Sequence, residues 1–358
     1  MNSAPYRRPI NYHQAPAVVF WEITKACALA CRHCRAQAQP KRHPLELTTQ
    51  EGYALVDQVC RFQPAPILVI SGGDPLMRRD LFDLAAYAVS HGLHTSLSPS
   101  VTALVTPKNL ARAYDAGVRH ISLSLDGATP QVHDGFRGVP GSFQRTLLAV
   151  QAARQAGLTV QLNTTVSRWN ASQLQDLAGI VGESGATQWD VFFLVPMGRA
   201  AAGEMLSPEE HEEVFRWMYH LSRQAPFRVR TTLGQPYRRV VIQEADARGE
   251  PADALPSSND GNGVCFISHV GEVFPSGFLP IPCGNVRAGH LVETYQGHPV
   301  FRALRDKGAL RGKCGLCPYN EVCGGCRARA YACTGDYLAA DPTCPYQPQP
   351  AVARASEG

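Results

Sequence analysis

The chain has 358 residues, with 34 Lys or Arg against 30 Asp or Glu, and its formal net charge is only +4. This near balance argues against a nucleic-acid partner, and no apolar run approaches the ~20 residues that span a bilayer, so we expect no membrane partner either. The twelve cysteines fall into two groups without a signal-peptide pattern, which indicates metal sites in a reducing cytoplasm rather than a secreted disulfide framework.

The first predicted strand, residues 17–24, is followed at once by three cysteines, Cys27, Cys31 and Cys34. Three thiolates at this spacing can hold three irons of a four-iron cluster and leave the fourth iron open for a ligand. The alternative is half of a zinc site, but such sites recruit a second ligand pair nearby, and the next cysteine is the single Cys60. The triplet therefore favours a cluster with an open iron over zinc.

Together with the segments that follow it, this triplet resembles the signature of radical S-adenosylmethionine (radical SAM) enzymes. The resemblance implies that Cys27, Cys31 and Cys34 ligate a catalytic 4Fe-4S cluster whose open iron binds S-adenosylmethionine (SAM). It also implies that SAM is cleaved reductively to a 5'-deoxyadenosyl radical, which abstracts a hydrogen from the substrate. The electron would come from a flavodoxin or ferredoxin-like donor.

The second predicted strand, 67–73, runs into a turn in which two glycines let a ligand approach the backbone closely. In the family, a similar Gly-Gly-Glu-Pro turn meets the amino group of the methionine moiety of SAM, mainly through backbone groups. This chain has Asp74 where the family usually has Glu. The resemblance assigns four residues of the turn to cofactor binding: Ser71, Gly72, Gly73 and Asp74.

The strand predicted over 120–127 ends in Ser124 and Asp126, at the carboxyl end where α/β sheets bind ligands. By resemblance, these two residues would bind the ribose hydroxyls of SAM. Residues 133–138 match the family's loop before its next helix. Within that loop, Arg137 would bind the methionine carboxylate, because a guanidinium fork fits a carboxylate bidentately.

Two later strands are predicted over 159–167 and 188–198. By resemblance, Asn163 on the first could reach a heteroatom of the adenosine. Leu194 on the second would suit the face of the adenine, although a buried leucine is more often only part of the core.

The predicted strands are separated by helix-like patterns, and the first helix opens with the capping box Thr48-x-x-Glu51. This alternation predicts an α/β fold, a partial (β/α)6 TIM-like barrel whose lateral mouth could admit a large substrate. The six strands are expected near 17–24, 67–73, 94–100, 120–127, 159–167 and 188–198.

The barrel is predicted to occupy residues 1–225, because the composition changes from about residue 226. Residues 226–263 read as a connecting segment and loop. Residues 264–348 begin with a predicted β-hairpin and form a small cysteine-rich iron–sulfur domain. Residues 349–358 are a tail.

The cysteine-rich domain resembles the cluster-binding extension called SPASM, or its shortened twitch form. By that match one auxiliary 4Fe-4S cluster would be ligated by Cys314, Cys317, Cys323 and Cys344. A second auxiliary cluster is less favoured, because Ser276 stands where the fuller pattern usually has a cysteine. The roles of the remaining cysteines of this domain stay open between spare ligand, core residue and redox thiol: Cys265, Cys283, Cys326 and Cys333.

The tail sequence looks most like the haem-biosynthetic branch of these enzymes, whose members modify carboxylate side chains of tetrapyrroles, including oxidative decarboxylation of propionates. Possible partners for such carboxylates are Arg199, Tyr237, Arg238, Arg327 and Arg329. The alternative is a maturase of a ribosomally made peptide, although only about sixteen residues precede the first strand, too few for an N-terminal recognition domain. A non-catalytic iron–sulfur electron carrier is less favoured still.

Overall fold

The computed structural model describes residues 11–252 and 255–348, in which ten strands form one sheet in the order β10-β9-β8-β1-β2-β3-β4-β5-β6-β7. Strands β1 to β7 are parallel to their neighbours, β8 is parallel to β1, and β9 and β10 are antiparallel additions at the edge. The strands are β1 (Val18–Glu22), β2 (Ile67–Ser71), β3 (Thr95–Leu97), β4 (His120–Ser124), β5 (Thr159–Val166), β6 (Gln188–Phe193), β7 (Arg228–Thr232), β8 (Val264–Ile267), β9 (Glu272–Phe274) and β10 (Gly284–Asn285).

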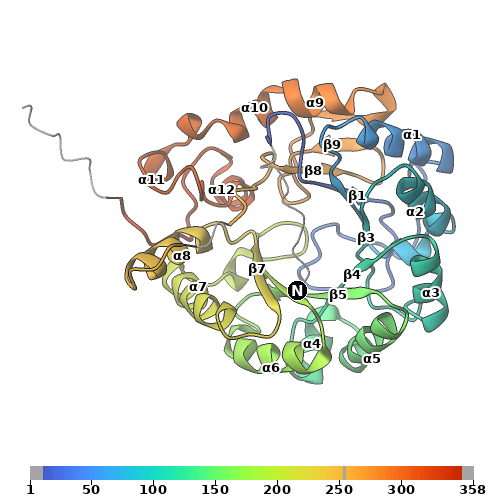
Figure 1. Ribbon diagram of the computed structural model, residues 1–358, viewed down its shortest axis with the longest axis horizontal. Coiled ribbons are helices and arrows are strands. Elements are labelled where there is room, and N and C mark those ends of the chain that lie inside the picture. Colours follow the sequence, from blue (N-terminus) through green and yellow to red (C-terminus); the bar gives the residue numbers. More distant parts are fainter. Residues whose placement is uncertain (1–10, 253–254, 349–358) are drawn as a thin grey trace, which may run out of the picture.

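The sheet curves into a partial barrel, and the helices cover its outer face (Figure 1). The predicted capping box of α1 is confirmed, since Glu51 N donates to Thr48 Oγ1 at 3.2 Å and Thr48 N donates to Glu51 Oε2 at 2.8 Å. The α-helices are α1 (Thr49–Cys60), α2 (Leu81–Ser90), α3 (Pro107–Asp115), α4 (Pro130–Arg137), α5 (Ser142–Gln155), α6 (Leu174–Ser184), α7 (Pro208–Ser222), α8 (Tyr237–Asp246), α9 (Leu291–Gly297), α10 (Pro299–Arg305), α11 (Gly312–Gly315) and α12 (Arg327–Thr334).

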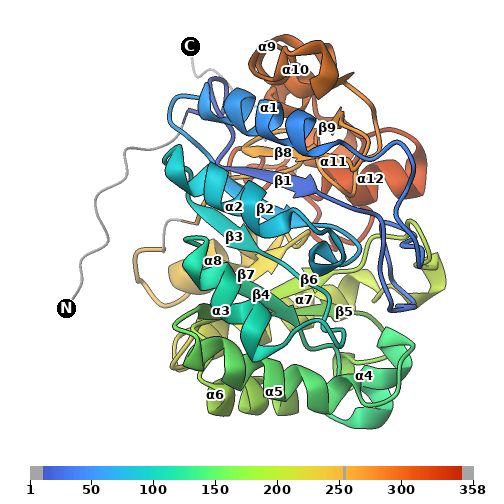
Figure 2. The ribbon, with the colours of Figure 1, turned by 90° about the vertical axis from the view of Figure 1, so that its right-hand side faces the viewer.

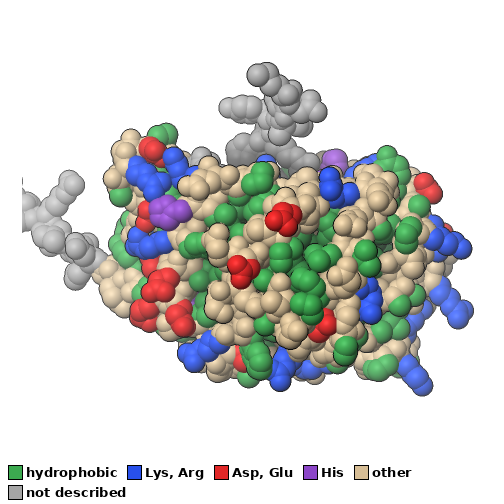
Figure 3. Space-filling view, turned by 90° about the horizontal axis from the view of Figure 1, so that it is seen from below, with side chains coloured by type: hydrophobic (Ala, Val, Ile, Leu, Met, Phe, Trp, Pro, Cys, Tyr) green, Lys and Arg blue, Asp and Glu red, His purple; other side chains and the backbone are tan. Residues whose placement is uncertain are grey.

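The main core lies between the sheet and this helical layer. Strand β1 illustrates the arrangement, because Val19 and Trp21 are fully buried in that core and the side view shows α1 and α2 packed outside β1 and β2 (Figure 2). The solvent face of the layer around α4, α5 and α6 mixes basic, acidic and apolar side chains (Figure 3). No helix within the described residues is both long and apolar enough to cross a membrane.

The structure extends the predicted barrel at both edges. Residues 226–263, expected to be a connecting segment and loop, begin with a further strand and helix, β7 and α8. Residues 133–138, expected to be a loop, form the end of α4 instead, which closes with Gly138 at φ +71°. The predicted hairpin is confirmed as β8 and β9, but β8 also pairs with β1 and so belongs to the barrel sheet.

The sheet runs without a break across residues 225 and 264, where the sequence predicts domain boundaries. The division into domains therefore stays a prediction. The predicted tail, 349–358, lies outside the described residues, as do the first ten residues of the predicted barrel domain.

Candidate functional site

The loop after β1 gathers the three predicted cluster cysteines. Cys27 and Cys31 are 5% and 7% exposed, and Cys34 packs against them. Each sulfur has an N–H donor: Leu29 N lies 3.3 Å from Cys27 Sγ, Ala38 N lies 3.4 Å from Cys34 Sγ, and Arg137 Nη1 lies 3.6 Å from Cys31 Sγ. Such donors stabilise thiolates that ligate iron, so the loop fits a cluster.

The described residues hold no compact site for a single metal ion. Within residues 11–252 and 255–348, no three His, Cys, Asp or Glu side chains lie close enough to hold one metal ion. A four-iron cluster needs a wider arrangement, because each of its cysteines binds a different iron. Burial raises the pKa of Cys27, so this thiol gives up its proton when metal binds.

The glycine turn after β2 packs directly against the segment that leads to Cys27. Gly73 N donates to Thr24 O at 2.8 Å, and Asp74 N donates to Ala26 O at 2.6 Å. A Cβ atom on Gly73 would lie 2.3 Å from Ala26 O. Only glycine therefore allows this approach, and the turn supports the cysteine loop in addition to its predicted role in binding SAM.

Two residues with hydroxyl groups after β3 also bind the glycine turn, and neither was predicted from the sequence. Ser100 Oγ donates to Gly73 O at 2.5 Å and lies 3.5 Å from Cys27 Sγ, while Thr102 Oγ1 donates to Asp74 Oδ2 at 2.7 Å. Their only signal in the sequence is their position just beyond the carboxyl end of a strand.

Asp74 itself is fully buried. Burial raises its pKa from 3.8 to about 6, although the hydrogen bonds from Thr102 and Leu76 partly oppose this shift. Since the folded-state pKa lies above the unfolded value, ionisation of Asp74 destabilises the fold increasingly as the pH rises from about 4 through 6.

We therefore expect Asp74→Asn to gain stability relative to wild type over that pH range, by at most about 3 kcal/mol above pH 7. Urea midpoints measured at several pH values check this, with exposed Asp83→Asn on α2 as the matched control. A constant difference between Asp74→Asn and wild type at all pH values would contradict it.

The predicted SAM ligands at the end of β4, on β5 and on α4 also lie close together, and two of them pair with each other. Arg137 from α4 forms an ion pair with the buried Asp126, which also accepts a hydrogen bond from Thr165 N at 2.7 Å. Ser124 and Asn163 lie opposite each other in the paired strands. The structure thus joins Arg137 and Asp126, which were expected to bind different parts of SAM, and their contacts to SAM stay predictions.

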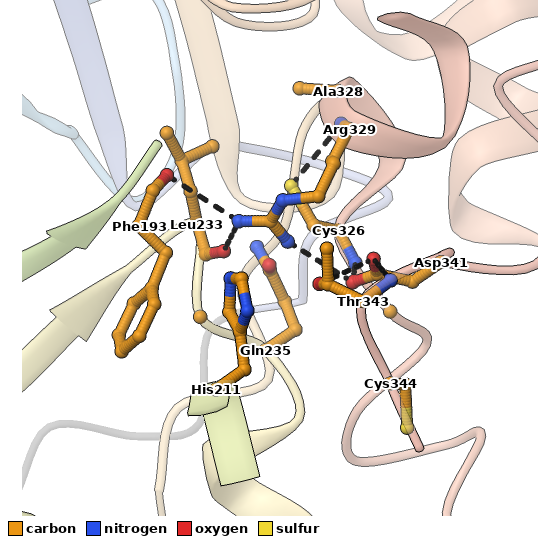
Figure 4. Close-up of polar contacts among 12 residues, drawn as sticks. Phe193, His211, Leu233, Gln235, Cys326, Ala328, Arg329, Asp341, Thr343 and Cys344 are labelled. Carbon is orange, nitrogen blue, oxygen red and sulfur yellow. Dashed lines mark hydrogen bonds and ion pairs between the residues drawn. The ribbon is translucent and has the colours of Figure 1, made fainter. Parts of the chain in front are cut away.

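Leu194, predicted to face the adenine, is buried just after β6, where its carbonyl accepts a hydrogen bond from Arg329 of α12 at 3.3 Å. Arg329 also donates to Leu233 O at 2.8 Å and pairs with Asp341 at 3.3 Å (Figure 4). The cysteine-rich domain is thereby fixed to the carboxyl ends of β6 and β7. Arg329 is fully buried and its guanidinium is occupied by these groups, so the structure does not favour its suggested role as a partner of substrate carboxylates.

The four predicted auxiliary ligands line one cavity, together with Arg239, Lys313 and Tyr346. Backbone N–H groups again point at sulfur, from Gly325 to Cys323 Sγ at 3.3 Å and from Asp341 to Cys314 Sγ at 3.4 Å. This donor set fits a cluster. The lining cysteines are Cys314, Cys317, Cys323 and Cys344.

The other cysteines of this domain stay outside the cavity lining. Cys265 and Cys326 are fully buried, whereas Cys333 is exposed. Ser276, which stands where the fuller family pattern has a cysteine, is buried and accepts a hydrogen bond from Phe278 N at 3.1 Å.

A further network that the sequence did not reveal links the cysteine loop to the β8–β9 turn. Glu22, at the end of β1, pairs with Arg35 at 3.0 Å and with His269 at 2.8 Å. Burial alone would raise the pKa of Glu22, but these two partners outweigh it and hold that pKa below its ordinary value. The carboxylate therefore stays ionised and ties the chain beyond Cys34 to the C-terminal hairpin.

The chain is similar to several known proteins. A family model described as the radical SAM superfamily matches residues 21–179. The chain is 40% identical over 342 residues to an AdoMet-dependent heme synthase of Methanosarcina barkeri, covering 93% of this chain and 97% of that protein. It is 41% identical to an AdoMet-dependent heme synthase of Oleidesulfovibrio alaskensis, with coverages of 93% and 88%. Streptococcus suis SuiB bound to S-adenosylmethionine shares the fold with a TM-score of 0.70 at 15% identity, over 93% of this chain and 78% of SuiB.

Proposed function

The chain belongs to the radical SAM superfamily, and from this premise we propose that it decarboxylates propionate side chains of a tetrapyrrole in haem biosynthesis. The observation that carries this proposal is the 40% identity, over nearly the whole length of both chains, to a protein named AdoMet-dependent heme synthase. A peptide substrate is the less favoured alternative, because the likeness to the peptide-bound form of SuiB is only 14% in sequence and supports the fold alone.

In this proposal Cys27, Cys31 and Cys34 hold the catalytic cluster, and their N–H donors stabilise the thiolates. When bound, the cluster and SAM supply a 5'-deoxyadenosyl radical, with the electron delivered by a flavodoxin or ferredoxin-like donor. The residues of the chain orient the cofactor and keep water from the reacting atoms.

In the same proposal, the segments around different strands contact different parts of SAM. The turn after β2 offers backbone groups to the methionine moiety, and the pair formed by Asp126 and Arg137 offers an acceptor and a donor at the end of β4. Asn163 lies within β5, opposite Ser124 at the end of β4, and the buried Leu194 directly follows β6; in this proposal both contact the adenosine.

The four cysteines that line the cavity of the C-terminal domain would hold one auxiliary cluster. We do not propose a second one, since Ser276 supplies a hydroxyl in place of an expected thiolate. Thiol ligands of this kind favour a reducing compartment, so we place the enzyme in the cytoplasm.

A direct test combines the anaerobically reconstituted protein with SAM, dithionite and an iron porphyrin that carries propionate side chains deuterated at the β-carbon. We expect mass spectrometry to show vinyl products and deuterium in the 5'-deoxyadenosine. Each vinyl group forms with loss of one hydrogen atom to the nucleoside, one carbon dioxide and one electron, which balances the electron that the cleavage of SAM takes up. Formation of unlabelled 5'-deoxyadenosine with an unchanged porphyrin would reject the tetrapyrrole substrate while leaving the radical SAM chemistry intact.

A further inference from the structure

The first residue of α12, Arg327, is a buried guanidinium without a carboxylate partner. It is 1% exposed, and it forms no ion pair with any carboxylate in the described part of the chain. Its N–H groups reach Ala339 O at 2.7 Å, Tyr337 O at 3.1 Å and Gly325 O at 3.3 Å. A buried charge is costly unless an opposite charge compensates it.

The remaining contact of Arg327 is to sulfur, since Nη2 lies 3.7 Å from Cys314 Sγ. Asp260 and Asp341 act on the guanidinium only at longer range, and both have other partners: Asp260 accepts from Ala328 N, and Asp341 pairs with Arg329. A thiolate at Cys314, as cluster ligation requires, would therefore supply the missing negative charge.

Arg329, two residues further along the same helix, shows that burial at this place does not prevent pairing. It is equally buried, yet its guanidinium is joined to the Asp341 carboxylate and to carbonyls at the ends of β6 and β7 (Figure 4). Arg329 thus fixes the cysteine-rich segment to the barrel, whereas Arg327 contacts the Cys314 thiol.

Gly325 makes room for the contact between arginine and sulfur. Its φ is +62°, and a Cβ atom there would lie 2.5 Å from Arg327 Nη2 and 3.1 Å from Cys314 Sγ. Any side chain at this position would push the guanidinium away from the thiol.

A second arginine, Arg239 of α8, lies on the cavity wall with Nη2 3.9 Å from Cys344 Sγ. Its charge is already compensated, because Nη1 donates to Glu212 Oε1 at 2.9 Å and Nη2 pairs with the other carboxylate oxygen. Two guanidinium groups thus contact the sulfurs of two different predicted ligands. The charge of Arg239 is balanced by a carboxylate, whereas the charge of Arg327 is not.

We propose that Arg327 is the charge partner of the Cys314 thiolate and raises the reduction potential of the auxiliary cluster, with a smaller net contribution from the Arg239–Glu212 pair. The reduced cluster carries one more negative charge than the oxidised one, so a fixed cation in a site of low dielectric favours reduction. The proposal rests on the auxiliary cluster of the proposed function. In this proposal Arg327 acts on the cluster through Cys314, and its effect is measured as a change in the reduction potential of the auxiliary cluster.

The test is a redox titration of the full-length reconstituted protein followed by EPR, in which the auxiliary signal is compared among variants. We expect Arg327→Met to lower the potential, and Arg327→Lys to restore most of the shift. Arg216→Met is the matched control, because Arg216 pairs with the same Glu212 but is half exposed and contacts no thiol in the described part of the chain. Its potential should equal that of wild type.

An unchanged potential in Arg327→Met at full iron content would overturn the proposal. If Arg327→Met fails to fold or loses the cluster, Arg327→Gln and Arg327→Lys are compared instead, since both keep N–H donors and differ in charge. Equal potentials for these two would overturn it as well. A wild-type iron content of only about four atoms would instead reject the auxiliary cluster itself, which distinguishes the two failures.

Discussion

Replacing Cys27, Cys31 and Cys34 together by alanine is expected to lower the iron content of the reconstituted protein from about eight to about four atoms per chain. The same change should abolish the formation of 5'-deoxyadenosine. The physical reason is that the three thiols, each with its own N–H donor, are the ligands gathered next to the glycine turn, while the auxiliary ligands lie in a separate cavity. Iron and sulfide analysis, EPR and chromatography of the nucleoside measure both effects.

Cys60→Ala is the matched control for the triple variant. Cys60 is half buried at the end of α1, and its sulfur lies 3.9 Å from the carbonyl oxygen of His91. Its removal should change neither iron content nor nucleoside formation. Zinc without nucleoside formation in the wild type would refute the cluster assignment, whereas about twelve irons would restore the second auxiliary cluster.

Replacing Arg329 by methionine is expected to destabilise the protein by about 3–5 kcal/mol, the typical cost of breaking a buried ion pair. The change leaves Asp341 ionised and fully buried, and it deprives carbonyls at the ends of β6 and β7 of their donors. The shift of the urea midpoint of the anaerobically reconstituted protein measures this loss.

Arg311→Met provides the comparison, because Arg311 pairs with Asp336 at 2.9 Å while its side chain is 69% exposed. An exposed pair contributes less than about 1 kcal/mol. Asp341→Asn introduced into Arg329→Met should recover part of the stability by removing the unpaired charge. Equal losses for Arg329→Met and Arg311→Met would show that the buried pair does not hold the domain in place.

Most of what the sequence predicted is encoded locally. The cysteine triplet, the glycine turn and the strand ends are short motifs, and each sits where one β-α unit passes into the next. The family assignment and the α/β class follow from these motifs and are confirmed. The individual contacts to SAM remain predictions.

The missed elements lack a local signal. Strand β7 alternates Arg228 and Arg230 with small residues and lies at the edge of the sheet, so it has no buried apolar run. The pairing of Arg329 with Leu194, and of Glu22 with His269, joins residues far apart in the chain. Such contacts depend on the tertiary fold, and no spacing rule predicts them.

The pairing of β1 with β8 bears on the order of events during synthesis. Strand β1 precedes the cysteine loop, yet one of its two neighbours in the sheet begins only at Val264. A contact between segments so distant in sequence forms late, and until then β1 is an open edge. The loop that carries Cys27 therefore gains its full support only when most of the chain has left the ribosome, so cluster loading in the cell should be a post-translational step.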